Sequence, residues 1–337
     1  MKLGIPRGLS FYSMYPFLYG FFSAIGIEVV LSDKTTKKTL SKGSSLVVTE
    51  TCLPVKIFVG QVLNLIEKGV ENIFVPSIQS IAPKIYNCSK IRGLPDLIRN
   101  VVKKPFNMIE PTLDKSQKGQ GLYQFLLECV DMEKIKKASK TGWRVYNNFQ
   151  VMLKSGMPYE KALKNAIAGK LLIEKDETEY PVSIALVSHA YNIYDERASM
   201  KVIDKLNKMG VKVYTAYQLT EEQLEEGVVS LGQEIYWANE AEMTGCAGYY
   251  LKDNKIDGLI TITAFGCGPD SLMLERVTRK SKQFNKPLLN LTIDEHTGEA
   301  GFITRLEAFV DMLYRKKRMQ GIVEEGFAPT SNVMEFI

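Results

Sequence analysis

The stretch VSIALVSH (182–189) decides the fold, because this short apolar run leads into a helical pattern at about 197–209. Gly210 stands where that helix should end, and VKVYTAY (211–217) follows as the next strand. Glycine commonly follows the last turn of a helix. A strand, a helix and a second strand in this order form the repeating unit of a parallel sheet with crossover helices.

The same alternation extends in both directions from this stretch. Further strands are predicted at LGIP (3–6), EVVLS (28–32), SLVVTE (45–50), NIFVPS (72–77), DGLITITAF (257–265) and PLLNLTI (287–293). Helices are predicted at 12–26, 54–69, 235–252, 269–284 and 299–318. Between 111 and 176 the β-branched runs give way to helical composition. We therefore expect an α/β protein with parallel sheets in two domains, 1–110 and 177–337, joined by a helical connection at 111–176.

Composition excludes several classes of protein. The 337 residues are 45% hydrophobic and 24% charged, and 43 basic residues against 38 acidic ones give a net charge of +5. The charges are interleaved, so they do not argue for a nucleic-acid partner. No stretch approaches the roughly 20 apolar residues that span a bilayer, and the N-terminus lacks the apolar core of a signal peptide. We expect a cytoplasmic protein with no membrane partner.

Nucleotide-binding and serine-hydrolase motifs are missing from the sequence. The segment Gly4-Ile5-Pro6-Arg7-Gly8 follows the first strand, yet it matches neither G-x-G-x-x-G nor the P-loop pattern. No G-x-S-x-G nucleophile motif is present. The sequence therefore gives no support to ATP binding by this chain or to serine-based hydrolysis.

The five cysteines divide into two groups. An odd number spread over a long chain without a secretion signal argues against a disulfide framework. Cys52 follows the predicted strand 45–50, Cys88 lies after NIFVPS, and Cys267 follows the strand 257–265 in a tight loop. Ligands of open parallel sheets bind beyond the carboxyl ends of the strands, where these three lie. Cys129 and Cys246 fall in helical patterns, where cysteine usually behaves as a small buried hydrophobe.

The spacing of the first three cysteines leaves two interpretations open. It is not a compact C-x-x-C ladder, so a zinc ribbon or a bacterial ferredoxin loop is excluded as a sequence signal. Three thiolates from distant loops are compatible with a 4Fe-4S cluster in which one iron is not held by cysteine. Ordinary loop thiols are the other interpretation, and spacing alone slightly favours them.

The two histidines, His189 and His296, each follow a predicted strand of the second domain. A lone histidine is more often structural than catalytic, but two at one sheet edge make proton donation a reasonable hypothesis. The neighbouring Asp294, Glu295 and Glu299 are acidic, and for Glu299 capping of the last helix is the favoured role. His189, Glu295 and His296 are thus the candidate catalytic residues.

Several segments together resemble a known family. They are GIPRGLSFYSMYPF, ETCLPVKIFVGQV, CSKIRGLPDLIRN, SHAYNIYD, AFGCGPDSL and KPLLNLTIDEHTGEAGFITRLEAF. They are similar to the activase-associated proteins of the 2-hydroxyacyl-CoA dehydratase and benzoyl-CoA reductase superfamily. The resemblance covers nearly the whole chain except the helical middle. It implies two Rossmann-like domains and an iron–sulfur cluster between them, held by the cysteines that lie in these segments, Cys52, Cys88 and Cys267.

The resemblance also implies a partner and a chemistry. The partner is an ATP-hydrolysing activase that supplies low-potential electrons, and the cluster would pass them on or reduce a small-molecule substrate. A non-catalytic scaffold or docking protein that carries the cluster is the alternative, and a three-cysteine zinc site is a third possibility. A larger double-cubane cluster would need further thiolates, either Cys246 or those of a second chain in a homodimer.

Overall fold

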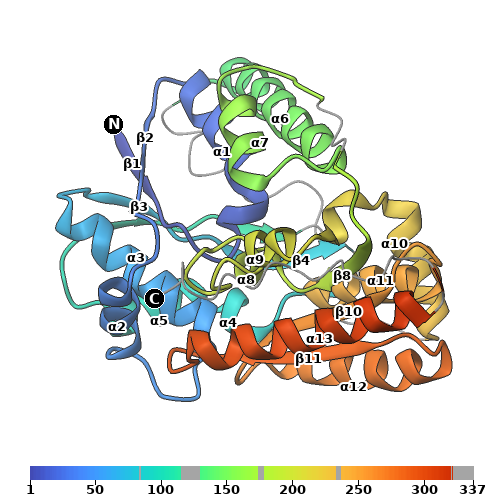
Figure 1. Ribbon diagram of the computed structural model, residues 1–337. Helices are drawn as coiled ribbons and strands as arrows, with labels where there is room; N and C mark the ends of the chain where they lie inside the picture. The colour runs from blue at the N-terminus through green and yellow to red at the C-terminus, as the bar shows by residue number, and fades with distance from the viewer. Residues whose placement is uncertain (83–84, 115–129, 174–177, 233–236, 320, 322–337) are drawn as a thin grey trace.

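Two four-stranded sheets, both wholly parallel, form the framework of the protein in the computed structural model (Figure 1). The structure describes residues 1–82, 85–114, 130–173, 178–232, 237–319 and 321. The first sheet has the order β2-β1-β3-β6, with β1 (Lys2–Ile5), β2 (Glu28–Leu31), β3 (Asn72–Phe74) and β6 (Asn107–Ile109). The second has the order β11-β10-β8-β9, with β8 (Val182–Val187), β9 (Val211–Tyr214), β10 (Gly258–Ala264) and β11 (Leu288–Ile293). The predicted α/β class with parallel sheets is confirmed.

Helices cover both faces of the first sheet. Helix α1 (Phe11–Ala24) packs against one face, and α3 (Leu53–Glu67) and α5 (Leu94–Val101) pack against the other. The long α6 (Met132–Lys154) and the shorter α7 (Tyr159–Ile167) lie on α1, where they form the green layer at the top of Figure 1. Short helices α2 (Lys37–Ser44) and α4 (Ser89–Arg92) complete this half.

The second sheet is also covered on both faces. Helices α11 (Ala238–Lys252) and α12 (Gly268–Gln283) pack on one face with α10 (Glu221–Leu231) beside them. Helices α9 (Val202–Lys208) and α13 (Glu299–Met319) pack on the other, and α8 (Ala190–Ile193) and the 3₁₀ turn η2 (Ala216–Gln218) lie in the connections. Apolar residues of α9 and α13 belong to the same buried cluster as those of α3, so one core runs between the sheets. The proposed division into domains at 110 and 177 stays a prediction.

A small third sheet has the order β5-β4-β7, with β4 (Ser77–Ala82), β5 (Ile85–Tyr86) and β7 (Thr112–Asp114). Pro76 separates β4 from β3, because proline has no N–H to continue a ladder. An isolated bridge between Tyr86 and Trp237 links this sheet to the second half. The sequence patterns did not predict it, since its strands are too short to show a clear alternation.

One predicted strand is wrong. Residues 45–50 form a turn after α2, and Val48 there is 71% exposed. The place beside β3 is taken by β6, a three-residue strand that no pattern indicated. A run of β-branched residues becomes a strand only where a neighbouring strand and a covering layer receive it. Cys52 therefore follows a turn and not a strand.

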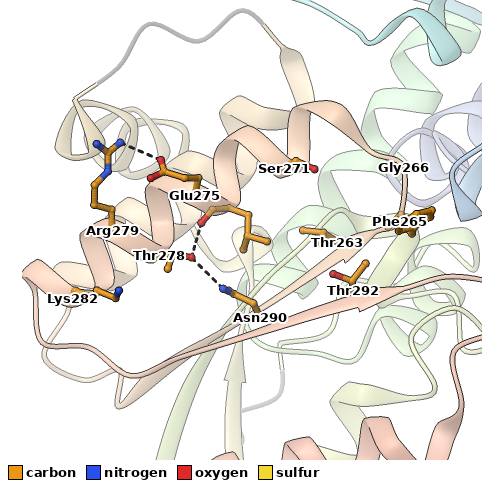
Figure 2. Close-up of a pocket in the computed structure, with 12 residues that line it drawn as sticks. Thr263, Phe265, Gly266, Ser271, Glu275, Thr278, Arg279, Lys282, Asn290 and Thr292 are labelled. Atoms are coloured by element: carbon orange, nitrogen blue, oxygen red, sulfur yellow. Dashed lines mark hydrogen bonds and ion pairs between the residues drawn. The ribbon is translucent and has the colours of Figure 1, made fainter. Parts of the chain in front are cut away.

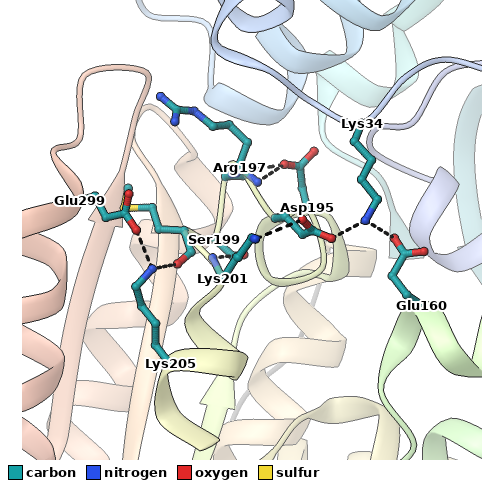
Figure 3. Close-up of polar contacts among 11 residues, drawn as sticks. Lys34, Glu160, Asp195, Arg197, Ser199, Lys201, Lys205 and Glu299 are labelled. Carbon is teal, nitrogen blue, oxygen red and sulfur yellow. Dashed lines mark hydrogen bonds and ion pairs between the residues drawn. The ribbon is translucent and has the colours of Figure 1, made fainter. Parts of the chain in front are cut away.

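A polar network joins the two halves near the loop between α8 and α9 (Figure 3). Asp195 accepts hydrogen bonds from the Tyr12 hydroxyl at 3.1 Å and the Thr35 hydroxyl at 2.6 Å, both in the first half. Lys34 forms ion pairs with Glu196 and, at 3.7 Å, with Glu160. The halves are thus held together by buried polar contacts as well as by apolar packing. Within the described residues, no helix is both long and apolar enough to cross a bilayer.

Candidate metal centre

Four candidate ligand residues occupy equivalent places in the fold, each immediately before a helix. Cys52 precedes α3, Cys88 precedes α4, His189 precedes α8 and Cys267 precedes α12. Each has extended backbone, and none of their side chains caps its own helix. Pro54 and Pro269 stand in the first turns of α3 and α12, where proline favours helix initiation. The thiols and the imidazole are therefore left available for other partners.

One lysine connects the three cysteine loops. Lys90, two residues after Cys88, donates through Nζ to the carbonyl of Glu50 at 3.2 Å and to that of Gly266 at 3.5 Å. Glu50 lies two residues before Cys52, and Gly266 lies directly before Cys267. Lys90 is half-buried, whereas Glu50 and Gly266 are exposed, so these bonds lie at the surface. The lysine thus fixes the positions of three segments that are distant in sequence.

Gly266 allows two of these loops to approach closely. Its φ is +76°, and a Cβ there would lie 2.8 Å from the carbonyl oxygen of Glu50. Any other residue would be strained by the backbone conformation and would also collide with the Glu50 carbonyl. Glycine at this position therefore lets the Cys267 loop lie against the Cys52 loop.

Two thiols at this centre, those of Cys52 and Cys267, have raised pKa values. Burial raises the pKa of Cys52, although the Lys90 ammonium opposes the rise, and Cys88 and Asp270 add to it. Burial, and then the carboxylate of Asp270, raise the pKa of Cys267. A nucleophilic cysteine needs a lowered pKa, so these two are poor nucleophiles. A bound metal ion would remove the thiol protons outright, which suits ligands better than nucleophiles.

His189 and Asp270 form a buried pair beside Cys267. His189 Nε2 lies 2.7 Å from Asp270 Oδ1, and the two residues are 4% and 1% exposed. Burial lowers the pKa of His189, but the Asp270 carboxylate outweighs it, and the pKa lies above its ordinary value. One ligand atom each from His189, Cys267 and Asp270 lies within 4.8 Å of the others, a grouping able to hold a metal ion.

Tyr191 forms one wall of the centre. Its ring lies 4.9 Å from that of His189, centroid to centroid. Burial raises the pKa of its phenol, and Asp270, Cys267, Cys52 and Cys88 raise it further. Three sulfurs and the carboxylate thus act on the ionisation of one phenol, although the group within 4.8 Å contains only Cys267 of the three cysteines.

The other residues singled out from the sequence lie elsewhere. Glu295 forms an ion pair with Lys56 of α3 at 2.5 Å between Oε1 and Nζ. The side chain of His296 is 83% exposed, and its Nε2 is 3.7 Å from Glu295 Oε1. Cys246 is buried in α11 with Met243 and Ala247. Cys129 lies outside the described residues. Of the three candidate catalytic residues, the structure brings His189 alone into the group with Cys267 and Asp270.

Sequence reasoning missed Asp270, Lys90 and Tyr191. Asp270 follows Gly268-Pro269 in the first turn of α12, where aspartate is commonplace as a partner of the helix dipole. Lys90 and Tyr191 lie within two residues of Cys88 and His189. Closeness in sequence to a candidate ligand was the only signal that could have found them.

A separate surface pocket lies between α12 and the strands β10 and β11 (Figure 2). It encloses about 610 Å³ and is lined mainly by polar residues, among them Thr263, Thr278 and Asn290. Phe265 and Gly266, at its end, directly precede Cys267. None of the candidate ligands lines this pocket, so it is a neighbour of the centre and not part of it.

Comparison with known proteins relates the chain to a protein family. No curated protein matches the chain. A family model described as the CoA enzyme activase uncharacterised domain (DUF2229) matches residues 2–219, a range that includes Cys52, Cys88 and His189 but not Cys267 or Asp270. The name of this domain links the chain to CoA enzyme activase systems. Because the match covers more than half of its length, the chain belongs to the DUF2229 family of CoA enzyme activase-associated domains.

Proposed function

We propose that Cys52, Cys88 and Cys267 together hold one iron–sulfur cluster, of the 4Fe-4S type, that accepts low-potential electrons from an ATP-dependent activase. The observation that carries this proposal is the position of Lys90, which binds the loops of all three cysteines at once. Ordinary loop thiols would need no such connection between distant segments. The family name supports the activase partner.

The donor set fits such a group. The thiols are at least partly buried, Cys88 adds to the raised pKa of Cys52, and Cys52 adds to that of Cys267. When bound, a 4Fe-4S cluster supplies one-electron transfer at low potential. Lys90 and the first turns of α3 and α12 place positive charge beside the three thiolates. The apolar core beneath α3 keeps water from one side of the site.

Iron and sulfide analysis tests the cluster. Protein reconstituted anaerobically should bind about four irons per chain. Serine substitution of Cys52, Cys88 or Cys267 should each lower that number strongly. Cys246→Ser is the matched control, since Cys246 is buried in α11, and its iron content should equal that of the unmodified protein. Equal iron content in all four variants would overturn the assignment.

The electron-accepting role is tested separately. Cluster-loaded protein is mixed with a CoA enzyme activase, ATP and a reductant. The mixture should give the electron paramagnetic resonance signal of a reduced cluster, and omission of ATP should abolish this signal. Reduction without turnover of any added small molecule would favour the alternative of a cluster-carrying docking protein. Absence of ATP-dependent reduction would contradict the proposal.

A single divalent metal ion is the second candidate, because His189, Cys267 and Asp270 alone could bind one. Under this hypothesis anaerobically purified protein would contain about one zinc or iron per chain and no sulfide. Loss of the metal in His189→Gln but not in Cys52→Ser would favour it. The opposite pattern would favour the cluster.

A further inference from the structure

Asp270 carries a carboxylate oxygen, Oδ2, that has no hydrogen-bond partner among the residues that the structure describes. The residue is 1% exposed. His189 occupies Oδ1, whereas no N–H or O–H group of the described residues donates to Oδ2. Leaving a buried charged oxygen without a hydrogen bond costs a few kcal/mol. A fold retains such a group most readily where something absent from the polypeptide binds it.

The carboxylate of Asp270 lies beside one of the three cysteines, Cys267. Asp270 stands three residues after Cys267, and residues at this spacing share one face of a helix. A carboxylate oxygen of Asp270 lies within 4.8 Å of the Cys267 sulfur. The carboxylate also raises the pKa of Cys52 and of Tyr191, which lie on other segments. Asp270 therefore lies next to Cys267 and His189, close enough to the Cys52 thiol to act on its charge.

We infer that Asp270 supplies the fourth protein ligand of the cluster through Oδ2, to the iron that no cysteine holds. This inference rests on the proposed cluster. His189 then acts as a positioning residue, because its bond to Oδ1 fixes the carboxylate and leaves Oδ2 free to bind. Carboxylate is a hard ligand and binds iron less strongly than thiolate does, so it completes the site while remaining exchangeable.

The lability of one iron provides the test. Reconstituted protein, Asp270→Ala and Asp270→Cys are each treated with one equivalent of ferricyanide, and iron content and the paramagnetic resonance spectrum are then recorded. The unmodified protein and Asp270→Cys should keep about four irons, whereas Asp270→Ala should fall to about three and show a three-iron signal. Imidazole added to the reduced cluster should change the spectrum of Asp270→Ala only.

The control is Glu240→Gln, which removes another buried carboxylate, one that is paired with Arg276 at 3.3 Å. It should behave like the unmodified protein. An imidazole-induced change in the unmodified protein would overturn the inference, since it would mean that the fourth position is open. This measurement needs no variant, so it stays decisive even if Asp270→Ala fails to fold. Failure of the unmodified protein to take up iron and sulfide would instead refute the proposed function itself.

Discussion

Asp195 and Asp270 are both buried aspartates of the second half, and their surroundings are opposite. Asp195, 3% exposed, accepts from the Tyr12 and Thr35 hydroxyls and, at 2.9 and 3.0 Å, from the backbone N–H groups of Arg197 and Ala198. Asp270, 1% exposed, has His189 on one oxygen, and no N–H or O–H group of the described chain donates to the other. A buried carboxylate whose oxygens all accept hydrogen bonds stabilises the fold. An equally buried carboxylate with one oxygen that accepts none marks a place for a ligand.

Replacing each aspartate by alanine should separate the two roles. In metal-free protein, Asp195→Ala leaves four donors unpaired and should lower the free energy of unfolding by about 4 kcal/mol. Asp270→Ala removes a charge that is already poorly satisfied, and it should cost about 1 kcal/mol. Urea unfolding of both variants gives the comparison. Equal losses would mean that Asp270 is structural as well.

A second polar contact between the two halves, the ion pair of Lys56 and Glu295, stabilises the fold as Asp195 does. Lys56 is 2% exposed and binds Glu295 of the second half and the carbonyl of Thr49. Lys56→Met leaves the partly buried carboxylate of Glu295 without its cation and should lower the free energy of unfolding by about 3 kcal/mol. Lys42→Met breaks the more exposed pair with Glu67 and should cost less than about 1 kcal/mol. Similar values in urea unfolding would show that Glu295 finds another partner.

The sequence predicts those features of the fold and the site that depend on local residues, and it does not predict those that depend on distant parts of the chain. Strands such as 182–187 and 258–264 are buried on both faces, and their apolar runs predict them without reference to the rest of the chain. Residues 45–50 are similarly apolar, but they form a turn because β6, and not this segment, pairs with β3. A common strand edge predicts a group of Cys52, Cys88 and Cys267, but only Cys267 follows a strand of a parallel sheet, so the resemblance and not topology carries that grouping. The orphan oxygen of Asp270 could not be predicted, since it exists only once every other donor has been placed.

The pH dependence of stability should differ in sign between the two structural carboxylates. Burial raises the pKa of Glu295, but its bond to Lys56 outweighs this and the pKa is lowered. Its contribution to stability is therefore present above about pH 4 and is lost as the pH falls through the lowered value. Burial raises the pKa of Asp195, so its contribution declines as the pH rises through that raised value.

Unfolding free energies of Glu295→Gln and Asp195→Asn, each compared with the unmodified protein between about pH 3 and pH 7, test these signs. The stability deficit of Glu295→Gln should shrink toward acid. That of Asp195→Asn should be greatest toward acid and shrink as the pH rises. If both stability deficits change in the same direction with pH, the pKa of one of the two carboxylates is shifted in the direction opposite to the one expected from its burial and contacts.

Substitution of Lys90 should have the smallest effect on stability. Its main effect should be on the binding of the cluster, as for Asp270. Lys90→Met removes two bonds to carbonyls, of 3.2 and 3.5 Å, and should change the unfolding of metal-free protein by no more than about 1 kcal/mol. Because it releases the loops of Cys52 and Cys267, it should make the loaded protein lose iron to a chelator about fivefold faster. Lys2→Met, which breaks an exposed pair with Glu28, should leave that rate unchanged. If Lys90→Met also releases iron at the unmodified rate, the three loops hold their positions without it, and Asp270 and the thiols alone define the site.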